Sequence, residues 1–89
     1  MDPNDLRERT TPDGLAPLLL AMWHARREDW AQAHEITQAI DTREAAWVHA
    51  YLHRQEGDLG NAQYWYQRAG KALPKLTLAS EWEEIVRAF

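Results

Sequence analysis

The stretch from His49 to Tyr66 constrains the fold most, because it carries the signals for a helix, a tight turn and a second helix. Gly57 suits the left-handed backbone conformation that ends a helix. Asp58 suits the position that caps the N-terminus of the next helix. So short a turn predicts two helices that pack side by side and run antiparallel.

Apolar residues recur at helical spacing through most of the chain, and no segment alternates with a period of two residues. The sequence therefore predicts an all-α fold of about five antiparallel helices. The N-terminal residues are polar, include two prolines and lack apolar periodicity, so we expect a flexible arm there. Pro74 is expected to stop the fourth helix, and Thr77 or the Ser80-x-x-Glu83 pattern to cap the last one. The predicted units are an arm (1–14) and a single domain (15–89) made of a hairpin (15–40), a second hairpin (44–73) and a last helix (78–89).

The composition limits what can hold this fold together. The chain has 89 residues, five tryptophans and no cysteine, so packing and not a disulfide must stabilise a small domain. The net charge of −4 and the mixed charges along the helices argue against nucleic acid as a partner. The longest apolar run, Leu18 to Trp23, is too short to span a membrane. We expect no membrane association, and the cytoplasm is the default location.

An internal repeat relates the two hairpins. Sliding the chain by about 29 residues aligns five identical pairs, at a spacing typical of stacked helical hairpins. Asp29 falls on Asp58 at the helix cap, and Ala33 falls on Ala62 where two helices need a small residue. The other pairs are Ala21 with Ala50, His24 with His53 and Gln38 with Gln67.

The second hairpin resembles the tetratricopeptide repeat. It carries Gly57-Asp58 at the turn, the Ala62-x3-Tyr66 signature, Ala69 and the closing Pro74. The first hairpin is degenerate, with Glu28 in place of the turn glycine and Thr37 in place of an aromatic residue. The amino-acid sequence of both hairpins is also similar to that of short uncharacterised bacterial proteins. The resemblance implies that the last helix caps the stack by covering its final apolar face.

The same resemblance implies a peptide-binding concave face. Five side chains would lie on it: Trp47, Tyr51, Arg54, Met22 and Arg26. The expected function is a small, non-catalytic protein-interaction or scaffold module with an unidentified protein or peptide partner. Tyr64, Trp65 and Arg68 cannot share the buried stripe of their helix, so they are candidates for a homodimer contact.

The histidines support an alternative function. His49 and His53 are four residues apart and share one helix face. A stable metal site needs three or four ligands, and only His24, His34 and Glu56 could supplement the pair. The repeat alignment of His24 with His53 favours a structural role. The alternative is a small metal- or ligand-binding protein, conceivably an enzyme, that uses His49, His53 and His24.

Other templates for chemistry fail. No glycine-rich phosphate loop is present, since Gly57-Asp-Leu-Gly60 lacks both the length and the lysine. The single serine, Ser80, lies far in sequence from the histidines. We therefore expect no catalytic residue, no assigned metal and no cofactor. Convergence of three histidine or carboxylate groups in one place would favour the metal- or ligand-binding alternative.

Overall fold

The protein is all-α: the computed structural model describes residues 1–89 and contains six helices and no strand. The helices are α1 (Pro3–Glu8), α2 (Pro17–Arg26), α3 (Trp30–Gln38), α4 (Arg43–Gln55), α5 (Leu59–Arg68) and α6 (Leu78–Ala88). The all-α prediction is confirmed, with one helix more than the sequence indicated. None of the six helices combines the length and apolarity that a membrane span requires.

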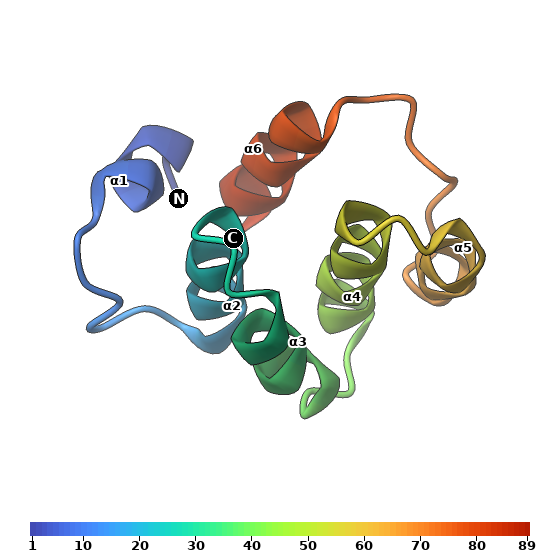
Figure 1. The fold of residues 1–89 in the computed structure, drawn as a ribbon, viewed down its shortest axis with the longest axis horizontal. Coiled ribbons are helices and arrows are strands. Elements are labelled where there is room, and N and C mark those ends of the chain that lie inside the picture. Colours follow the sequence, from blue (N-terminus) through green and yellow to red (C-terminus); the bar gives the residue numbers. More distant parts are fainter.

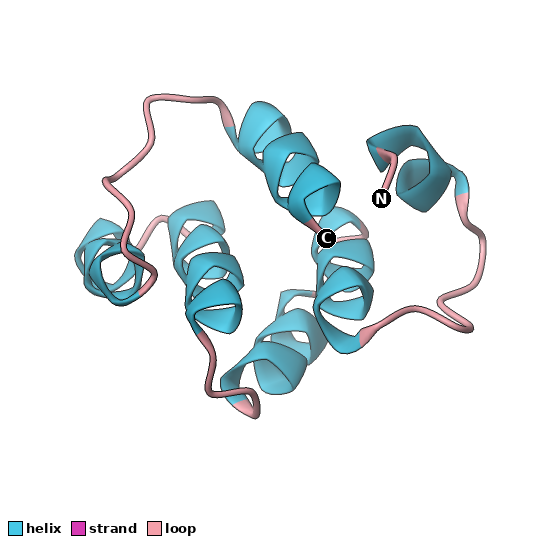
Figure 2. Cartoon of the chain, turned by 180° about the vertical axis from the view of Figure 1, so that it is seen from behind, coloured by secondary structure: helices cyan, strands magenta, loops and turns pink.

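Two helical hairpins form the body of the protein. Helix α2 packs on α3 and α4 packs on α5, while α3 also packs on α4 and so joins the hairpins. Figure 1 shows α4 between α3 and α5. Helix α6 lies against α2 and α4, and α1 lies against α2 and α6. The view from behind in Figure 2 shows the long loop that crosses from α5 to α6.

Side-chain caps start the four helices from α3 to α6. An aspartate caps α3 and α5, and a threonine caps α4 and α6. Asp29 accepts a hydrogen bond from the backbone of Gln32, and Asp58 accepts one from Asn61. Thr42 caps α4 in the same way. Thr77, and not Ser80, caps α6. Asp29 and Asp58 are the caps predicted from the sequence, and Thr77 is one of the two residues predicted to cap α6.

Three helices end with a residue in the left-handed conformation. Gly57 has φ of 87°, and Glu28 adopts the equivalent conformation with φ of 61°. Gly70, with φ of 72°, ends α5, and the amide of Lys71 then bonds to the carbonyl of Tyr66 at 2.9 Å. Helix α5 therefore stops at Arg68, short of the predicted limit near residue 73, because a glycine and not the later proline ends it.

The predicted flexible arm contains a helix. Asp2 caps α1 and Pro3 occupies its first turn, a combination that favours helix initiation. Leu6 is fully buried, and Arg7 pairs with Glu83 of α6 at 3.1 Å. A helix of six residues offers only one buried apolar side chain in its middle, so it gives no periodic pattern in the sequence.

The core lies where α2, α4 and α6 meet. Trp82 of α6 is 1% exposed and donates its indole hydrogen to the carbonyl of Met22 at 2.9 Å. Ile85 and Val86 of the same helix are fully buried. Helix α6 thus covers α2 and α4 instead of stacking on α5, as a cap on the last hairpin would. Leu59 at the start of α5 and Leu73 in the loop after it are 55% and 44% exposed.

Candidate metal centre

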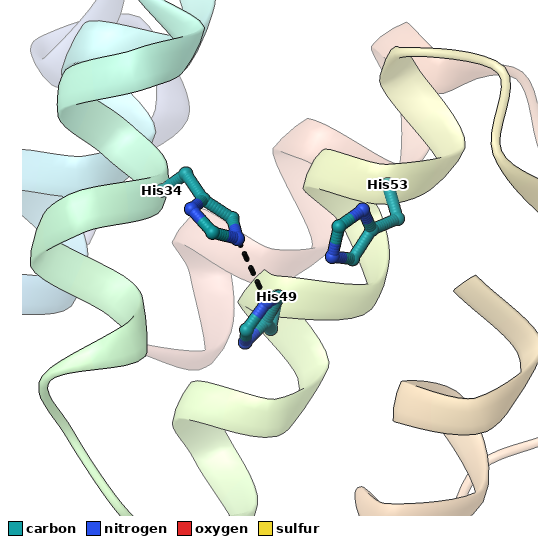
Figure 3. Close-up of side chains that lie close together, drawn as sticks. All are labelled: His34, His49 and His53. Atoms are coloured by element: carbon teal, nitrogen blue, oxygen red, sulfur yellow. Dashed lines mark hydrogen bonds between the residues drawn. The ribbon is translucent and has the colours of Figure 1, made fainter. Parts of the chain in front are cut away.

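Three histidines from the two hairpins converge between α3 and α4 (Figure 3). We call His34, His49 and His53 the histidine cluster. Nε2 of His34 lies 3.1 Å from Nε2 of His49, and one nitrogen atom from each of the three rings lies within 4.8 Å of the others. His49 and His53 are one turn apart on the face of α4 that meets α3. His34 reaches them from α3.

Two tryptophans fix the planes of the imidazole rings. The indole of Trp30 stacks on His34 with centroids 4.7 Å apart, and its Nε1 donates to the carbonyl of Leu52 at 2.7 Å. The indole of Trp65, on α5, stacks on His49 at 3.8 Å. The rings are therefore held by packing from α3 and α5, which lowers the cost of organising a ligand site.

A carboxylate fixes the tautomer of the third ring. Nδ1 of His53 lies 2.8 Å from Oε1 of Glu56. Because a carboxylate only accepts hydrogen bonds, Nδ1 carries a hydrogen, so the neutral form of this ring has its lone pair on Nε2. This is the carboxylate–histidine arrangement that orients imidazoles in metal sites.

Burial disfavours the charged form of two rings of the cluster, His34 and His49. Burial, followed by the neighbouring His34 and His53, lowers the pKa of His49 to about 4. Burial and His53 also lower the pKa of His34, while the charge of Glu56 acts in the opposite direction. Neutral imidazoles are the form that binds metal ions. At neutral pH His34 and His49 need no deprotonation of a charged ring before binding.

His24, named in the sequence-based alternative, lies outside the cluster. Its Nδ1 is 3.3 Å from Oδ2 of Asp29, next to the turn between α2 and α3. In the repeat alignment His24 is equivalent to His53, whereas the position equivalent to His34 in the second hairpin is not a histidine. His34 was one of the three supplements considered from the sequence. Only the packing of α3 on α4 brings it to the pair.

The side chains predicted for a concave binding face lie under α6. Met22, Trp47 and Tyr51 are buried. Arg54 pairs with Glu81 of α6 at 2.8 Å and also donates to the carbonyl of Leu76. Only Arg26 is exposed, with its guanidinium 5.0 Å from the ring of Trp82. A partner could reach this face only by displacing α6.

A buried carboxylate that the sequence did not single out holds α6 in this place. Glu81 is 1% exposed and accepts hydrogen bonds from Nε1 of Trp47 at 3.2 Å and from the hydroxyl of Tyr66. With Arg54, three donors on α4 and α5 meet one acceptor on α6. Its only sequence signal is a glutamate next to the apolar stripe of a helix.

The candidate dimer residues divide between two environments. Trp65 faces inward onto His49. Tyr64 is 50% exposed, and Nη1 of Arg68 donates to its hydroxyl at 3.1 Å. The guanidinium of Arg68 also lies 5.1 Å from the ring of Trp65. Tyr64 and Arg68 therefore remain on the surface, while Trp65 belongs to the wall of the histidine cluster.

No similarity to a known protein indicates a function for this chain. It matches no protein-family model, no curated protein and no solved structure.

Proposed function

We propose that this protein binds a divalent transition-metal ion through His34, His49 and His53. The convergence of three imidazoles from two different hairpins carries the proposal. In a tetrahedral zinc site with Zn–N bonds of about 2.0–2.1 Å, neighbouring nitrogens lie about 3.3 Å apart. The 3.1 Å between His34 and His49 is close to that value, and a nitrogen of His53 lies within 4.8 Å of both.

The ligand chemistry narrows the class of ion. Imidazole nitrogen suits Zn²⁺, Cu²⁺, Ni²⁺ and Co²⁺, whereas Mg²⁺ and Ca²⁺ prefer oxygen. In the metal-free protein one of the two facing nitrogens, on His34 or His49, donates its hydrogen to the other. Ion binding requires the tautomer in which that hydrogen sits on Nδ1 of the same ring, so that both Nε2 atoms offer a lone pair and both rings stay neutral. Glu56 supports the site from behind His53, as carboxylates do in zinc proteins.

Such an ion joins α3 to α4, and hence the first hairpin to the second. A domain of 89 residues has a limited core and no disulfide. Binding to the folded state alone adds stability of about 2.7 kcal/mol when the free ion is at about 100 times its dissociation constant. The proposed role is thus a metal-loaded helical module whose hairpins are fixed relative to each other.

Titration of the full chain with Zn²⁺ in a calorimeter tests the proposal, after treatment with a chelator. We expect one ion per chain and a higher melting temperature in the loaded protein. His34→Ala and His53→Ala should lose this binding while circular dichroism shows unchanged helicity. His24→Ala is the matched control, since His24 is also partly buried but lies outside the cluster. Equal affinity in His34→Ala and His24→Ala would reject the site.

A second candidate is a tetratricopeptide-like scaffold that pairs with a second copy of itself through α5. The equivalent turns at Glu28 and Gly57 support hairpins of this type. Helix α6 leaves the outer side of α5 uncovered, where Tyr64 and Leu59 are about half exposed. Sedimentation equilibrium should then give a dimer that Tyr64→Ala converts to a monomer. A wild-type monomer at all concentrations would exclude this role.

A further inference from the structure

The histidine cluster offers an ion fewer protein ligands than a closed structural site would. No fourth histidine or carboxylate has a ligand atom within reach of all three rings. Glu56 is already engaged by Nδ1 of His53, on the side of the ring away from the free nitrogen. Zinc-class ions take at least four ligands, and sites with three protein ligands keep one position for an exogenous group.

The charge around the cluster favours a negative group in that position. Three neutral imidazoles leave the two positive charges of the ion uncompensated, and Glu56 supplies a single negative charge behind His53. A bound ion is the largest local charge in such a site, and uncompensated charge in a buried place is costly. An anionic fourth ligand removes this cost.

A pocket adjoins the cluster at His49. It has a volume of about 360 Å³ and lies between the end of α3, the start of α4 and α5. His49 and Trp65 form part of its wall, so one imidazole belongs to both the cluster and the pocket. The remaining polar wall contains two guanidinium groups and one carboxylate, and its residues are Gln38, Asp41, Thr42, Arg43 and Arg68.

Each of the two guanidinium groups of this pocket has N–H groups left for an incoming anion, although Nη1 of Arg68 donates to the hydroxyl of Tyr64. Arg43 takes part in none of the ion pairs of the chain. The nearest carboxylate to Arg68 is that of Asp41, 3.9 Å away and fully exposed. Guanidinium groups bind planar O–C–O groups through two parallel hydrogen bonds. The pocket therefore suits a small carboxylate better than a spherical anion.

We propose that the metal ion of the histidine cluster takes a small carboxylate as its fourth ligand, and that this anion enters through the pocket lined by Arg43 and Arg68. The inference rests on the proposed metal binding. It adds an exogenous ligand of defined chemistry and assigns Arg43 and Arg68 as the groups that attract it.

Cobalt substitution tests the inference, because the visible absorption of Co²⁺ reports both its binding and its ligands. The full chain is loaded with Co²⁺ and titrated with sodium acetate, with sodium perchlorate at equal ionic strength as the reference. We expect a saturable change in the position and intensity of the cobalt bands with acetate only. The Arg43→Ala/Arg68→Ala variant should need at least tenfold more acetate for half the change. Lys75→Ala/Arg87→Ala, which removes the same charge elsewhere, should behave as the wild type.

Each outcome has a separate meaning. Absence of the cobalt bands overturns the metal site itself and the carboxylate with it. Cobalt bands that acetate leaves unchanged overturn the fourth ligand and leave metal binding intact. An acetate response that is equal in both double variants overturns the assignment of Arg43 and Arg68.

Discussion

The hydroxyl of Tyr66 lies 2.6 Å from Oε2 and 2.7 Å from Oε1 of Glu81, and it donates its hydrogen to this buried carboxylate. The bond links α5 to α6, although the backbones of these helices do not pack together. Trp47 and Arg54 donate to the same group from α4. One side chain of α6 thus fixes that helix against both members of the second hairpin.

Removing this carboxylate should weaken the fold substantially. We expect Glu81→Ala to lower the free energy of unfolding by about 3–5 kcal/mol, because the half-buried Arg54 loses its partner and buried donors lose their acceptor. Urea unfolding followed by circular dichroism measures the change. Glu84→Ala, an exposed position on α6, is the control and should stay within about 0.5 kcal/mol of the wild type. Equal unfolding midpoints for the two variants would show that the network contributes nothing.

High pH should destabilise the protein through two buried tyrosines. Burial, and then the charge of Glu81, raises the pKa of Tyr51 to about 12. Burial and the hydrogen bond to Glu81 raise the pKa of Tyr66 as well. Tyrosines of the unfolded chain lose their protons near pH 10. Above that pH the unfolded state binds fewer protons than the folded state, so stability is full below about pH 10 and falls as pH rises toward 12.

Urea midpoints measured from about pH 8 to pH 11 test this dependence. The wild type should lose stability above about pH 10, and Tyr51→Phe should lose less over the same range. The comparison of slopes separates the titration from any constant effect of the substitution. Identical slopes for the two proteins would contradict the assignment to Tyr51.

The two equivalent turns should respond in opposite directions to exchange of their residues. Glu28 has a positive φ that favours glycine, so Glu28→Gly should stabilise the protein by about 0.5–1 kcal/mol. A Cβ added at Gly57 meets no atom within 4 Å, so Gly57→Ala should cost about 1 kcal/mol through the backbone alone. Thermal unfolding measures both. A loss of stability in Glu28→Gly would mean that the glutamate side chain outweighs its backbone strain.

The burial of Leu6 gives a test of the N-terminal helix. If α1 is docked in solution, Leu6→Ala should lower the free energy of unfolding by about 2–5 kcal/mol, as for other buried leucines. Leu76→Ala, at a position 40% exposed, is the matched control and should have little effect. Chemical denaturation measures both variants. No difference between them would indicate that α1 contributes little to the stability of the domain.

The carboxylate behind His53 should tune the proposed metal site. Glu56→Gln removes the charge that orients this imidazole, so we expect the affinity for Zn²⁺ to fall by about 10- to 100-fold with the fold retained. Competition with a chromophoric chelator gives the affinity. Glu35→Gln removes an exposed charge from α3, next to His34 in the sequence, and should leave the affinity unchanged. A similar loss in both variants would point to general electrostatics and not to the bond with His53.

The parts of the fold that local sequence determines were predictable. Caps at Asp29, Asp58 and Thr77 act on backbone amides three residues away, so their signals lie within a single turn. The left-handed Gly57 is equally local. The end of α5 was predicted too late in the sequence. Two residues can stop this helix, and Gly70 does so before Pro74 is reached.

The parts that depend on distant contacts were harder to predict. Leu6 is buried because α1 packs on α2 and α6, and no periodic pattern in the sequence predicts this packing. The pair of His49 and His53 is visible in the sequence because four residues make one helical turn. His34 was only one of several candidate partners, since its approach depends on how α3 crosses α4. The alternative function named His24 as the third ligand, but Asp29 is its partner and it lies at the turn between α2 and α3.

The position of α6 across α2 and α4 has a consequence for how the chain folds. The contacts within each hairpin join residues close in sequence, whereas the bond from Trp82 to Met22 spans 60 residues. Local contacts form with little loss of loop entropy, and distant ones form late. Substitutions in the buried stripe of α6 should therefore accelerate unfolding while leaving the refolding rate almost unchanged. The kinetic lifetime of the native state is then set by its last helix, and the speed of its formation by the two hairpins.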